Sequence, residues 1–234
     1  MRNRILTGGH THSFPHAAPA LAQLLAAYGI ESAIDFDIDA GLAAVDRERP
    51  ELLTVYALRW TMQVGDKYAP YRAKWSYRLS EPGRAAFESH LARGGGLLAL
   101  HTAVICFDDW PAWNRILGGT WQWGRSSHPP VGRVAVKPAD VADPVVAGLP
   151  AFEIADEVYG DLDFAQPVQP LFVAQALAGD WQPVAWKHGV GKGRVVVDTL
   201  GHSAEAFSHP VHRRLVARAA LWAIGRPDAE VERV

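Results

Sequence analysis

The sequence predicts an α/β fold, an open and mostly parallel β-sheet with helices on both faces. In the first half of the chain, apolar segments of strand length alternate with helical segments, and most connections are short. One of these segments, residues 51–58, is apolar almost throughout, which is typical of a strand covered on both faces. Further strands after residue 120 are expected to extend the sheet. No repeat or low-complexity segment divides the chain, so residues 1–234 are predicted to form a single domain.

The predicted elements of the first half follow from local signals. Leu21, Leu24 and Leu25 share one face of a helix over about residues 17–28, and Gly29 suits the position just after its end. Ser80 is a good N-cap for the next helix, which has Pro82 in its first turn. The predicted strands are 4–7, 30–36, 51–58 and 97–101, and the predicted helices are 17–28, 80–93 and 110–117.

Residues 59–79 contain no clear helix or strand and are rich in aromatic side chains. A segment of this length without regular structure usually serves as a lid, an interface or a flexible connection. Two interpretations therefore stay open, a lid over a site or a surface that packs on a second copy in a homo-oligomer.

The second half of the chain has a different pattern. Strands are predicted at 131–136, 171–176, 184–187 and 194–200, and the last helix spans about 210–224. Residues 188–193 contain three glycines and Lys192. A phosphate-binding loop requires Ser or Thr directly after the lysine, and this chain has Gly193 there. This segment is therefore predicted to be a hairpin turn.

Composition excludes several classes of function. Lys and Arg total 23 and Asp and Glu total 25, a balance that argues against a nucleic-acid partner. The single cysteine, Cys106, rules out a disulfide within the chain and a Cys-rich zinc module. We find no signal-peptide core and no run of about 20 apolar residues, so we expect a cytoplasmic protein that does not enter membranes.

Histidines follow three of the predicted strands. His10 and His12 come after the first strand, His101 ends the strand at 97–101, and His202 follows the strand at 194–200. Ligands of open parallel sheets bind just beyond the carboxyl ends of the strands. The sequence therefore predicts one shared site that contains these imidazoles.

Two further segments contribute candidate site residues. Asp156 and Glu157 are adjacent on an extended segment, so at most one of them points directly into a site; Tyr159 follows. Trp121 and His128 belong to an aromatic segment that is able to wall a pocket and present an imidazole. A carboxylate near histidine orients the ring, raises its pKa or acts as acid or base itself.

The metal-binding signal is weaker. No His-Glu-x-x-His motif or comparable spacing occurs in the sequence. A divalent metal such as zinc between His10, His101 and His202 remains a variant of the shared site, because imidazole-rich sites favour zinc. No other cofactor is predicted.

Several stretches resemble the ThuA-like family, which is named for trehalose utilisation, and the resemblance covers nearly the whole chain. The matching segments are 8–10, 94–101, 143–149, 156–159, 183–186, 191–194, 200–202 and 220–223. Their order and spacing make the resemblance specific, although each segment alone is a weak signal.

The family looks like a branch of the class I glutamine amidotransferase-like superfamily, which implies a flavodoxin-like sheet. In amidotransferases a cysteine occupies the sharp turn between a strand and a helix, whereas this chain has His101 there. The resemblance places His202 and Glu205 near the His and Glu positions of that triad. Without a thiolate at position 101, covalent glutamine hydrolysis is not expected. The resemblance implies a carbohydrate substrate, such as a disaccharide or a keto-sugar.

The predicted function is therefore a sugar-transforming enzyme. His101 and His202 exchange protons with the substrate, and Glu157 or Asp156 tunes one of them. His10, His12, Trp121, His128, Asp156 and Tyr159 are the predicted substrate-binding residues. One alternative is a non-catalytic carbohydrate-binding or interaction domain. Another is hydrolysis through Cys106, although burial as a small apolar residue explains this cysteine better.

Overall fold

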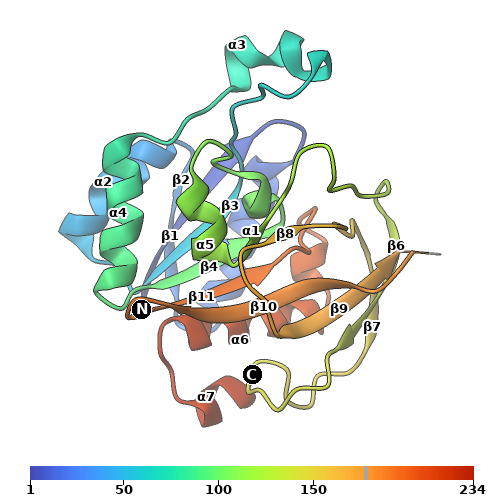
Figure 1. Ribbon diagram of the computed structural model, residues 1–234. Coiled ribbons are helices and arrows are strands. Elements are labelled where there is room, and N and C mark those ends of the chain that lie inside the picture. The colour runs from blue at the N-terminus through green and yellow to red at the C-terminus, as the bar shows by residue number, and fades with distance from the viewer. Residues whose placement is uncertain (177–178) are drawn as a thin grey trace.

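The fold is a nine-stranded sheet with helices on both faces, seen in a computed structural model that describes residues 1–176 and 179–234 (Figure 1). The strand order is β2-β1-β3-β4-β11-β10-β9-β6-β7. The first five strands in this order are parallel, and the other four are antiparallel to their neighbours. The predicted α/β class is confirmed, together with the extension of the sheet in the second half of the chain.

The parallel strands form the buried centre of the molecule. Every residue of β3 and β4 is buried, as the continuous apolarity of these segments predicts. The parallel strands are β2 (Glu31–Asp35), β1 (Arg2–Gly9), β3 (Leu52–Leu58), β4 (Gly96–Leu100) and β11 (Gly193–Asp198). This order matches the doubly wound pattern 2-1-3-4-5, with β11 as the fifth strand.

The antiparallel extension begins at the hairpin between β10 and β11. The turn of this hairpin consists of Gly191, with φ +61°, and Lys192. The predicted hairpin turn at 188–193 is therefore confirmed, and it is shorter than predicted. The added strands are β10 (Gln182–Val190), β9 (Pro170–Ala176), β6 (Gly132–Pro138) and β7 (Phe152–Asp156), and a small second sheet pairs β5 (Gly119–Thr120) with β8 (Asp163–Phe164).

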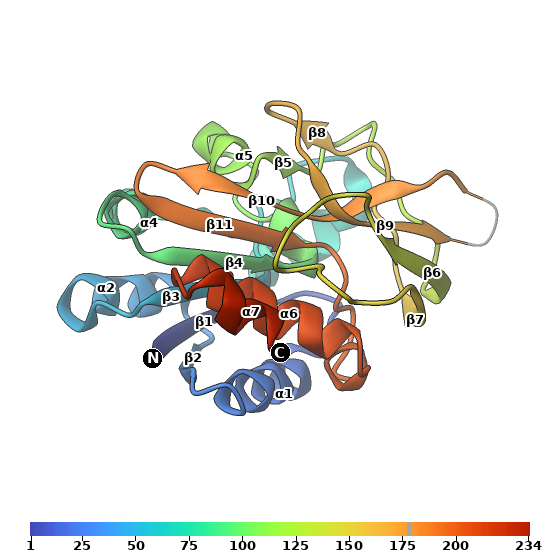
Figure 2. The ribbon, with the colours of Figure 1, turned by 90° about the horizontal axis from the view of Figure 1, so that it is seen from below.

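Helices cover both faces of the parallel strands (Figure 2). Helices α1 (Phe14–Ala26) and α6 (His212–Ala223) pack together on one face, and α2 (Ile38–Glu48) packs with α4 (Glu81–Ala92) on the other. The Ser80 hydroxyl accepts a hydrogen bond from the Gly83 amide, which confirms the predicted N-cap. The remaining helices are α3 (Arg72–Trp75), α5 (Pro111–Leu117) and α7 (Asp228–Glu232), with 3₁₀ turns at Asp66–Tyr71, His101–Ile105 and Ala206–Ser208. No helix in the described part of the chain is long and apolar enough to cross a membrane.

Two local features differ from the sequence predictions. Helix α2 was not predicted, although the Asp37 side chain caps it by accepting a hydrogen bond from the Ala40 amide. Strand β1 continues through Gly8 and Gly9 instead of ending before them. A Cβ atom on Gly9 would lie 2.2 Å from the carbonyl oxygen of Leu58, so glycine is required by the close approach of β1 to β3.

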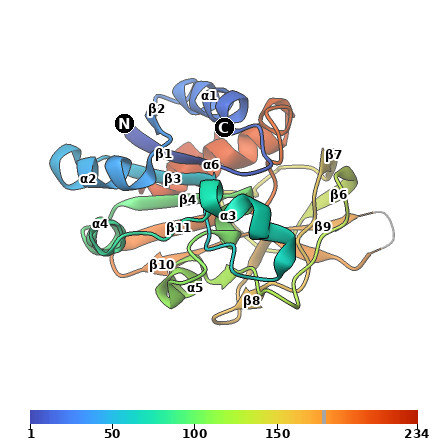
Figure 3. The ribbon, with the colours of Figure 1, turned by 90° about the horizontal axis from the view of Figure 1, so that it is seen from above.

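The aromatic segment 59–79 folds into a 3₁₀ turn and α3 and stands out from the body of the molecule at the top of Figure 1. Seen from above, it lies in front of the sheet (Figure 3). Tyr68 packs edge-on against Trp60 at a ring-centroid distance of 4.6 Å, and Trp60 stacks on Trp123 at 4.2 Å. These contacts attach the segment to the region beyond the carboxyl ends of the strands.

Candidate functional site

A cavity of about 350 Å³ lies where the parallel strands end, and it contains most of the predicted site residues. Its wall combines aromatic rings, imidazoles and one carboxylate. The lining residues are His10, Thr11, His12, Leu58, Trp60, Lys67, Tyr68, Tyr71, Thr102, Ile105, Trp121, Trp123, His128, Glu157, Tyr159 and His202. A larger cavity of about 490 Å³ beside β6 and β7 has no histidine in its wall. The smaller cavity is therefore the candidate functional site, because its wall contains the imidazoles.

His101 is fully buried behind the wall of this cavity, where it contacts the wall residues His12 and Tyr159. Its φ of +51° marks the sharp turn from β4 into the 3₁₀ turn, so the strand ends at Leu100, one residue before the predicted end at His101. Its Nδ1 donates a hydrogen bond to the carbonyl oxygen of Thr199 at 2.9 Å, which leaves Nε2 without a proton when the ring is neutral. Burial lowers the pKa of His101 to about 4, so the ring is neutral at pH 7.

His12 approaches His101 from the loop after β1. Thr11 has φ +70°, and the reversal at this residue directs the His12 side chain toward the end of β4. Nε2 of His12 lies 3.1 Å from Nε2 of His101. Burial and the neighbouring imidazoles lower the pKa of His12 to about 3.

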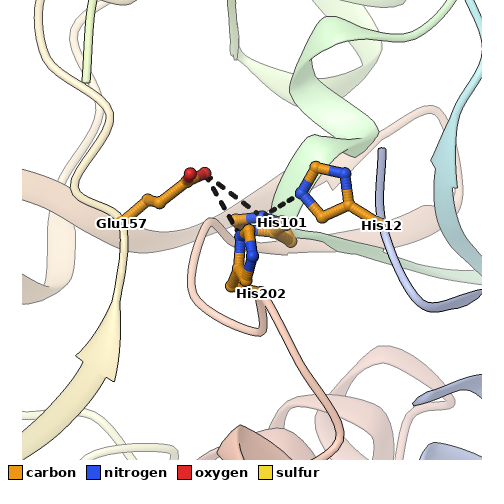
Figure 4. A group of neighbouring side chains, drawn as sticks. All are labelled: His12, His101, Glu157 and His202. Atoms are coloured by element: carbon orange, nitrogen blue, oxygen red, sulfur yellow. Dashed lines mark hydrogen bonds and ion pairs between the residues drawn. The ribbon is translucent and has the colours of Figure 1, made fainter. Parts of the chain in front are cut away.

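Glu157 and His202 complete a group of four side chains (Figure 4). Oε2 of Glu157 lies 3.4 Å from Nδ1 of His202 and 3.6 Å from Nε2 of His101. Burial opposes the charge of Glu157, but its contact with His202 and the nearby imidazoles lower the pKa of the carboxyl to about 2. Contact with the Glu157 carboxylate in turn raises the pKa of His202.

Tyr159 links His101 to Glu157. Its hydroxyl lies 3.1 Å from Nε2 of His101 and 3.3 Å from Oε2 of Glu157. Burial and the charge of Glu157 raise the pKa of Tyr159 well above its ordinary value, so the phenol keeps its proton.

Asp156 lies next to this group but outside the cavity wall. Its buried carboxylate accepts hydrogen bonds from the amides of Gly201 at 2.8 Å and His202 at 3.3 Å. It also accepts one from the Glu157 amide at 2.8 Å. Asp156, expected from the sequence to bind substrate, does not line this cavity, and its hydrogen bonds fix the backbone from which Glu157 and His202 extend.

His10 lies apart from the group of four side chains. It lines the cavity, but its ring stacks on Tyr71 at 4.3 Å and lies near Trp75 at 5.8 Å. The group of potential metal ligands contains His12 and not His10. The set His10, His101 and His202 that the sequence suggested is therefore replaced by a set in which His12 is the third imidazole.

The other predicted wall residues face the cavity. Trp121 meets Tyr159 edge-on at 5.4 Å, and Nδ1 of His128 lies 3.4 Å from Oε1 of Glu157. Trp60, Tyr68 and Trp123 also line the cavity and are not among the predicted site residues. Two features of the sequence indicate these wall residues: the aromatic content of residues 59–79, and the position of Trp123 two residues after Trp121.

Glu205 and Cys106, the two residues suggested by the resemblance to amidotransferases, do not line this cavity. Glu205 is exposed, and the carboxylate beside His202 is Glu157. The Cys106 thiol is buried and donates to the carbonyl oxygen of Ala57 at 3.1 Å. Burial raises the pKa of Cys106 to about 12, which suppresses the nucleophilic thiolate.

The four clustered side chains offer the donor types of a transition-metal site. One ligand atom from each of His12, His101, Glu157 and His202 lies within 4.8 Å of all the others. Imidazole nitrogen and carboxylate oxygen both bind zinc. The same groups, without a metal, are able to transfer protons near neutral pH. The arrangement therefore supports acid–base chemistry and metal binding.

Comparison with known proteins agrees with the fold. A ThuA-like protein from Parabacteroides merdae has 20% sequence identity and a TM-score of 0.71, with 96% of this chain and 90% of that chain covered. A ThuA-like protein from Bacteroides uniformis has 17% identity and a TM-score of 0.65, with coverage of 96% and 91%. A cytoplasmic protein from Salmonella typhimurium has 12% identity and a TM-score of 0.61, with coverage of 95% and 97%. The expected flavodoxin-like fold is confirmed.

Sequence comparison identifies the family. No curated protein sequence matches the chain significantly. The family model described as trehalose utilisation matches residues 4–223, which is nearly the whole chain. The resemblance seen in the sequence is thereby confirmed, and the chain belongs to the ThuA family.

Proposed function

We propose that this protein is a sugar-transforming enzyme that acts on a disaccharide or a keto-sugar. The observation that carries the proposal is the convergence of His101, His202 and Glu157 beside a cavity with aromatic walls, which Glu157 and His202 line and behind which His101 is buried. Apolar walls with a few convergent polar groups of perturbed pKa are typical of small-molecule sites. The family is described as trehalose utilisation, which favours a carbohydrate as the small molecule.

The proposed chemistry begins with proton transfer. The neutral His101 ring has an unprotonated Nε2 in the group, which suits a general base. His202, whose pKa is raised beside Glu157, suits a general acid. A keto-sugar has an acidic C–H next to its carbonyl group, and His101 is proposed to accept this proton. The C–H electron pair moves toward the carbonyl group, whose oxygen is proposed to take the proton of His202, and the charge of Glu157 stabilises the protonated His101 ring that results.

The cavity wall supports sugar binding. Its volume of about 350 Å³ lies at the lower end of the range for small-molecule sites, roughly 300–1,000 Å³. The rings of Trp121 and Tyr68 offer apolar surfaces for the faces of a sugar, while His128 and Lys67 offer polar groups for its hydroxyls. The proposal further includes one catalytic domain over residues 1–234 and a cytoplasmic location.

The test is a comparison of product formation from trehalose, other disaccharides and their keto derivatives. Wild type, His101→Ala and His16→Ala are incubated with each sugar, and products are separated by chromatography. His16 is exposed and lies outside the cavity wall, so its variant is the matched control. We expect wild type and His16→Ala to form product, and His101→Ala to be slower by about 10²- to 10⁴-fold.

Two results contradict this proposal. Equal rates in wild type and His101→Ala would remove His101 from the mechanism. Binding of a sugar without turnover by the wild type would instead favour a non-catalytic carbohydrate-binding domain.

A further inference from the structure

We infer that His12, His101, Glu157 and His202 bind one divalent transition-metal ion, with zinc as the first candidate. Three imidazoles and one carboxylate from four separate segments of the chain point toward a common centre (Figure 4). Imidazole-rich donor sets suit zinc among the biological divalent ions.

The spacing of the donor atoms agrees with such a site. Bonds of about 2.0–2.1 Å in tetrahedral geometry place neighbouring donor atoms roughly 3.3–3.4 Å apart. Three of the six donor–donor distances are 3.1 Å from His12 to His101, 3.4 Å from His202 to Glu157 and 3.6 Å from His101 to Glu157, and all six lie within 4.8 Å. Small side-chain movements therefore suffice to admit the ion.

The orientation of the imidazoles gives independent support. Nδ1 of His101 is committed to the carbonyl oxygen of Thr199, so Nε2 presents its lone pair to the group. His12 is oriented similarly, because its Nδ1 lies 3.4 Å from the carbonyl oxygen of His10. Histidines that ligate metals usually donate the other ring N–H to a carbonyl or carboxylate. With both Nδ1 atoms so engaged, the lone pairs of the two Nε2 atoms face each other at 3.1 Å, an arrangement that a cation between them stabilises.

The other two members of the group also have features of metal ligands. Nδ1 of His202 is buried, and its ion-pair contact with Oε2 of Glu157 at 3.4 Å does not have the geometry of a hydrogen bond, nor does any other described residue supply one. A polar atom buried without such a partner is unusual in a folded protein. The Tyr159 hydroxyl is placed to donate to Glu157, as outer hydrogen bonds do for carboxylate ligands.

This inference deepens the proposed function, and the role of the ion in catalysis rests on it. With the ion bound, His101 and His202 would be ligands, so the proton-transfer roles proposed for them apply to the metal-free protein, and the ion would instead polarise a carbonyl group of the substrate. Tyr159 and His128 are then the titratable groups of the cavity wall beside the group.

The experiment measures metal binding alone. Untagged protein is treated with a chelator, titrated with Zn²⁺ by calorimetry, and analysed for bound zinc after gel filtration. The variants are His12→Ala, Glu157→Gln and His10→Ala. His10→Ala is the matched control, because it removes an imidazole two residues from His12 that lies outside the ligand group. Thermal unfolding of each metal-free variant establishes that it is folded.

We expect about one zinc ion per chain in wild type and in His10→Ala. Affinity is expected to fall by at least about tenfold in His12→Ala and in Glu157→Gln. The inference is overturned if wild type holds no stoichiometric zinc, or if folded His12→Ala and Glu157→Gln both bind as wild type does. A protein that binds zinc without transforming any sugar would contradict only the proposed function. Turnover of a sugar without zinc binding would contradict only this inference.

Discussion

Nε2 of His12 lies 3.1 Å from Nε2 of His101, although 89 positions separate the two residues in the chain. They follow β1 and β4, which have β3 between them in the sheet. The contact depends on two local reversals, at Thr11 with φ +70° and at His101 itself with φ +51°. Left-handed backbone is uncommon for residues other than glycine, and such strain clusters at functional sites.

The pairing of Glu157 with His202 predicts a measurable change in ionisation. In chelator-treated protein, Glu157→Gln removes the carboxylate that raises the pKa of His202. We therefore expect the pKa of His202 to fall in this variant, as measured by NMR titration of the imidazole. Glu153→Gln, in an exposed ion pair with Arg133, serves as the control and should leave the pKa of His202 unchanged. An unaltered pKa in Glu157→Gln would contradict the pairing.

Burial of His101 predicts that the metal-free protein loses stability in mild acid. The pKa of His101 is about 4 in the folded state, compared with about 6.5 in an unfolded chain. Between these pH values the unfolded state binds a proton that the folded state does not, so the free energy of unfolding falls as pH falls. His101→Gln should show a weaker dependence when urea unfolding is compared at pH 7 and pH 5. If the free energy of unfolding fell equally in both proteins between pH 7 and pH 5, His101 would not be buried as a neutral ring.

The aromatic wall predicts a defect that concerns binding more than chemistry. Trp123 lines the cavity and stacks on Trp60 at 4.2 Å. Trp123→Ala should raise the KM for a sugar substrate by roughly tenfold, since aromatic contacts contribute about 0.5–1.5 kcal/mol beyond their buried area. Its kcat should change less. Trp181→Ala removes a partly exposed tryptophan outside the cavity and should leave both constants unchanged.

A buried ion pair supports the segment that carries His202. Nε2 of His212 lies 2.9 Å from Oδ2 of Asp198, and its Nδ1 lies 2.9 Å from the carbonyl oxygen of Ala206. Both ring nitrogens therefore face acceptors. Burial opposes the charge, but the carboxylate of Asp198 raises the pKa of His212.

Breaking this pair should strongly destabilise the protein. We expect Asp198→Asn to lower the free energy of unfolding by about 3–5 kcal/mol, because it leaves a buried imidazolium without its counter-charge. Urea unfolding at pH 6 measures the change. The exposed Asp140 provides the control, and Asp140→Asn should lie within about 0.5 kcal/mol of wild type. A loss of less than about 1 kcal/mol in Asp198→Asn would mean that His212 is neutral in the folded protein.

The fold could be predicted largely from the alternation of apolar strands with helices. The strands β3 and β4 are buried throughout, and this burial is visible directly as continuous apolar sequence. Helix α2 was missed even though Ile38, Leu42 and Val45 have helical spacing after the N-cap Asp37. Its polar positions resemble a loop when read one by one, and only the period of the apolar residues identifies the helix.

The site could be predicted as a set of strand ends but not in its detail. The sequence placed imidazoles after three strands, and His12, His101 and His202 do meet. It could not choose His12 over His10, because that choice depends on the positive φ of Thr11 between them. It also could not show which of the adjacent carboxylates enters the site. The side chain of Asp156 is directed by the register of β7, whereas Glu157 lies just beyond the strand and faces the cavity.

The most direct test of the proposed reaction centre is proton exchange on a keto-disaccharide in D₂O. Proton NMR would follow the C–H next to the carbonyl group in the presence of wild type or His101→Ala. The account predicts that wild type replaces this hydrogen with deuterium, and that His101→Ala does so at least about 100-fold more slowly. Equal exchange in the two proteins, or none above the rate without protein, would contradict it.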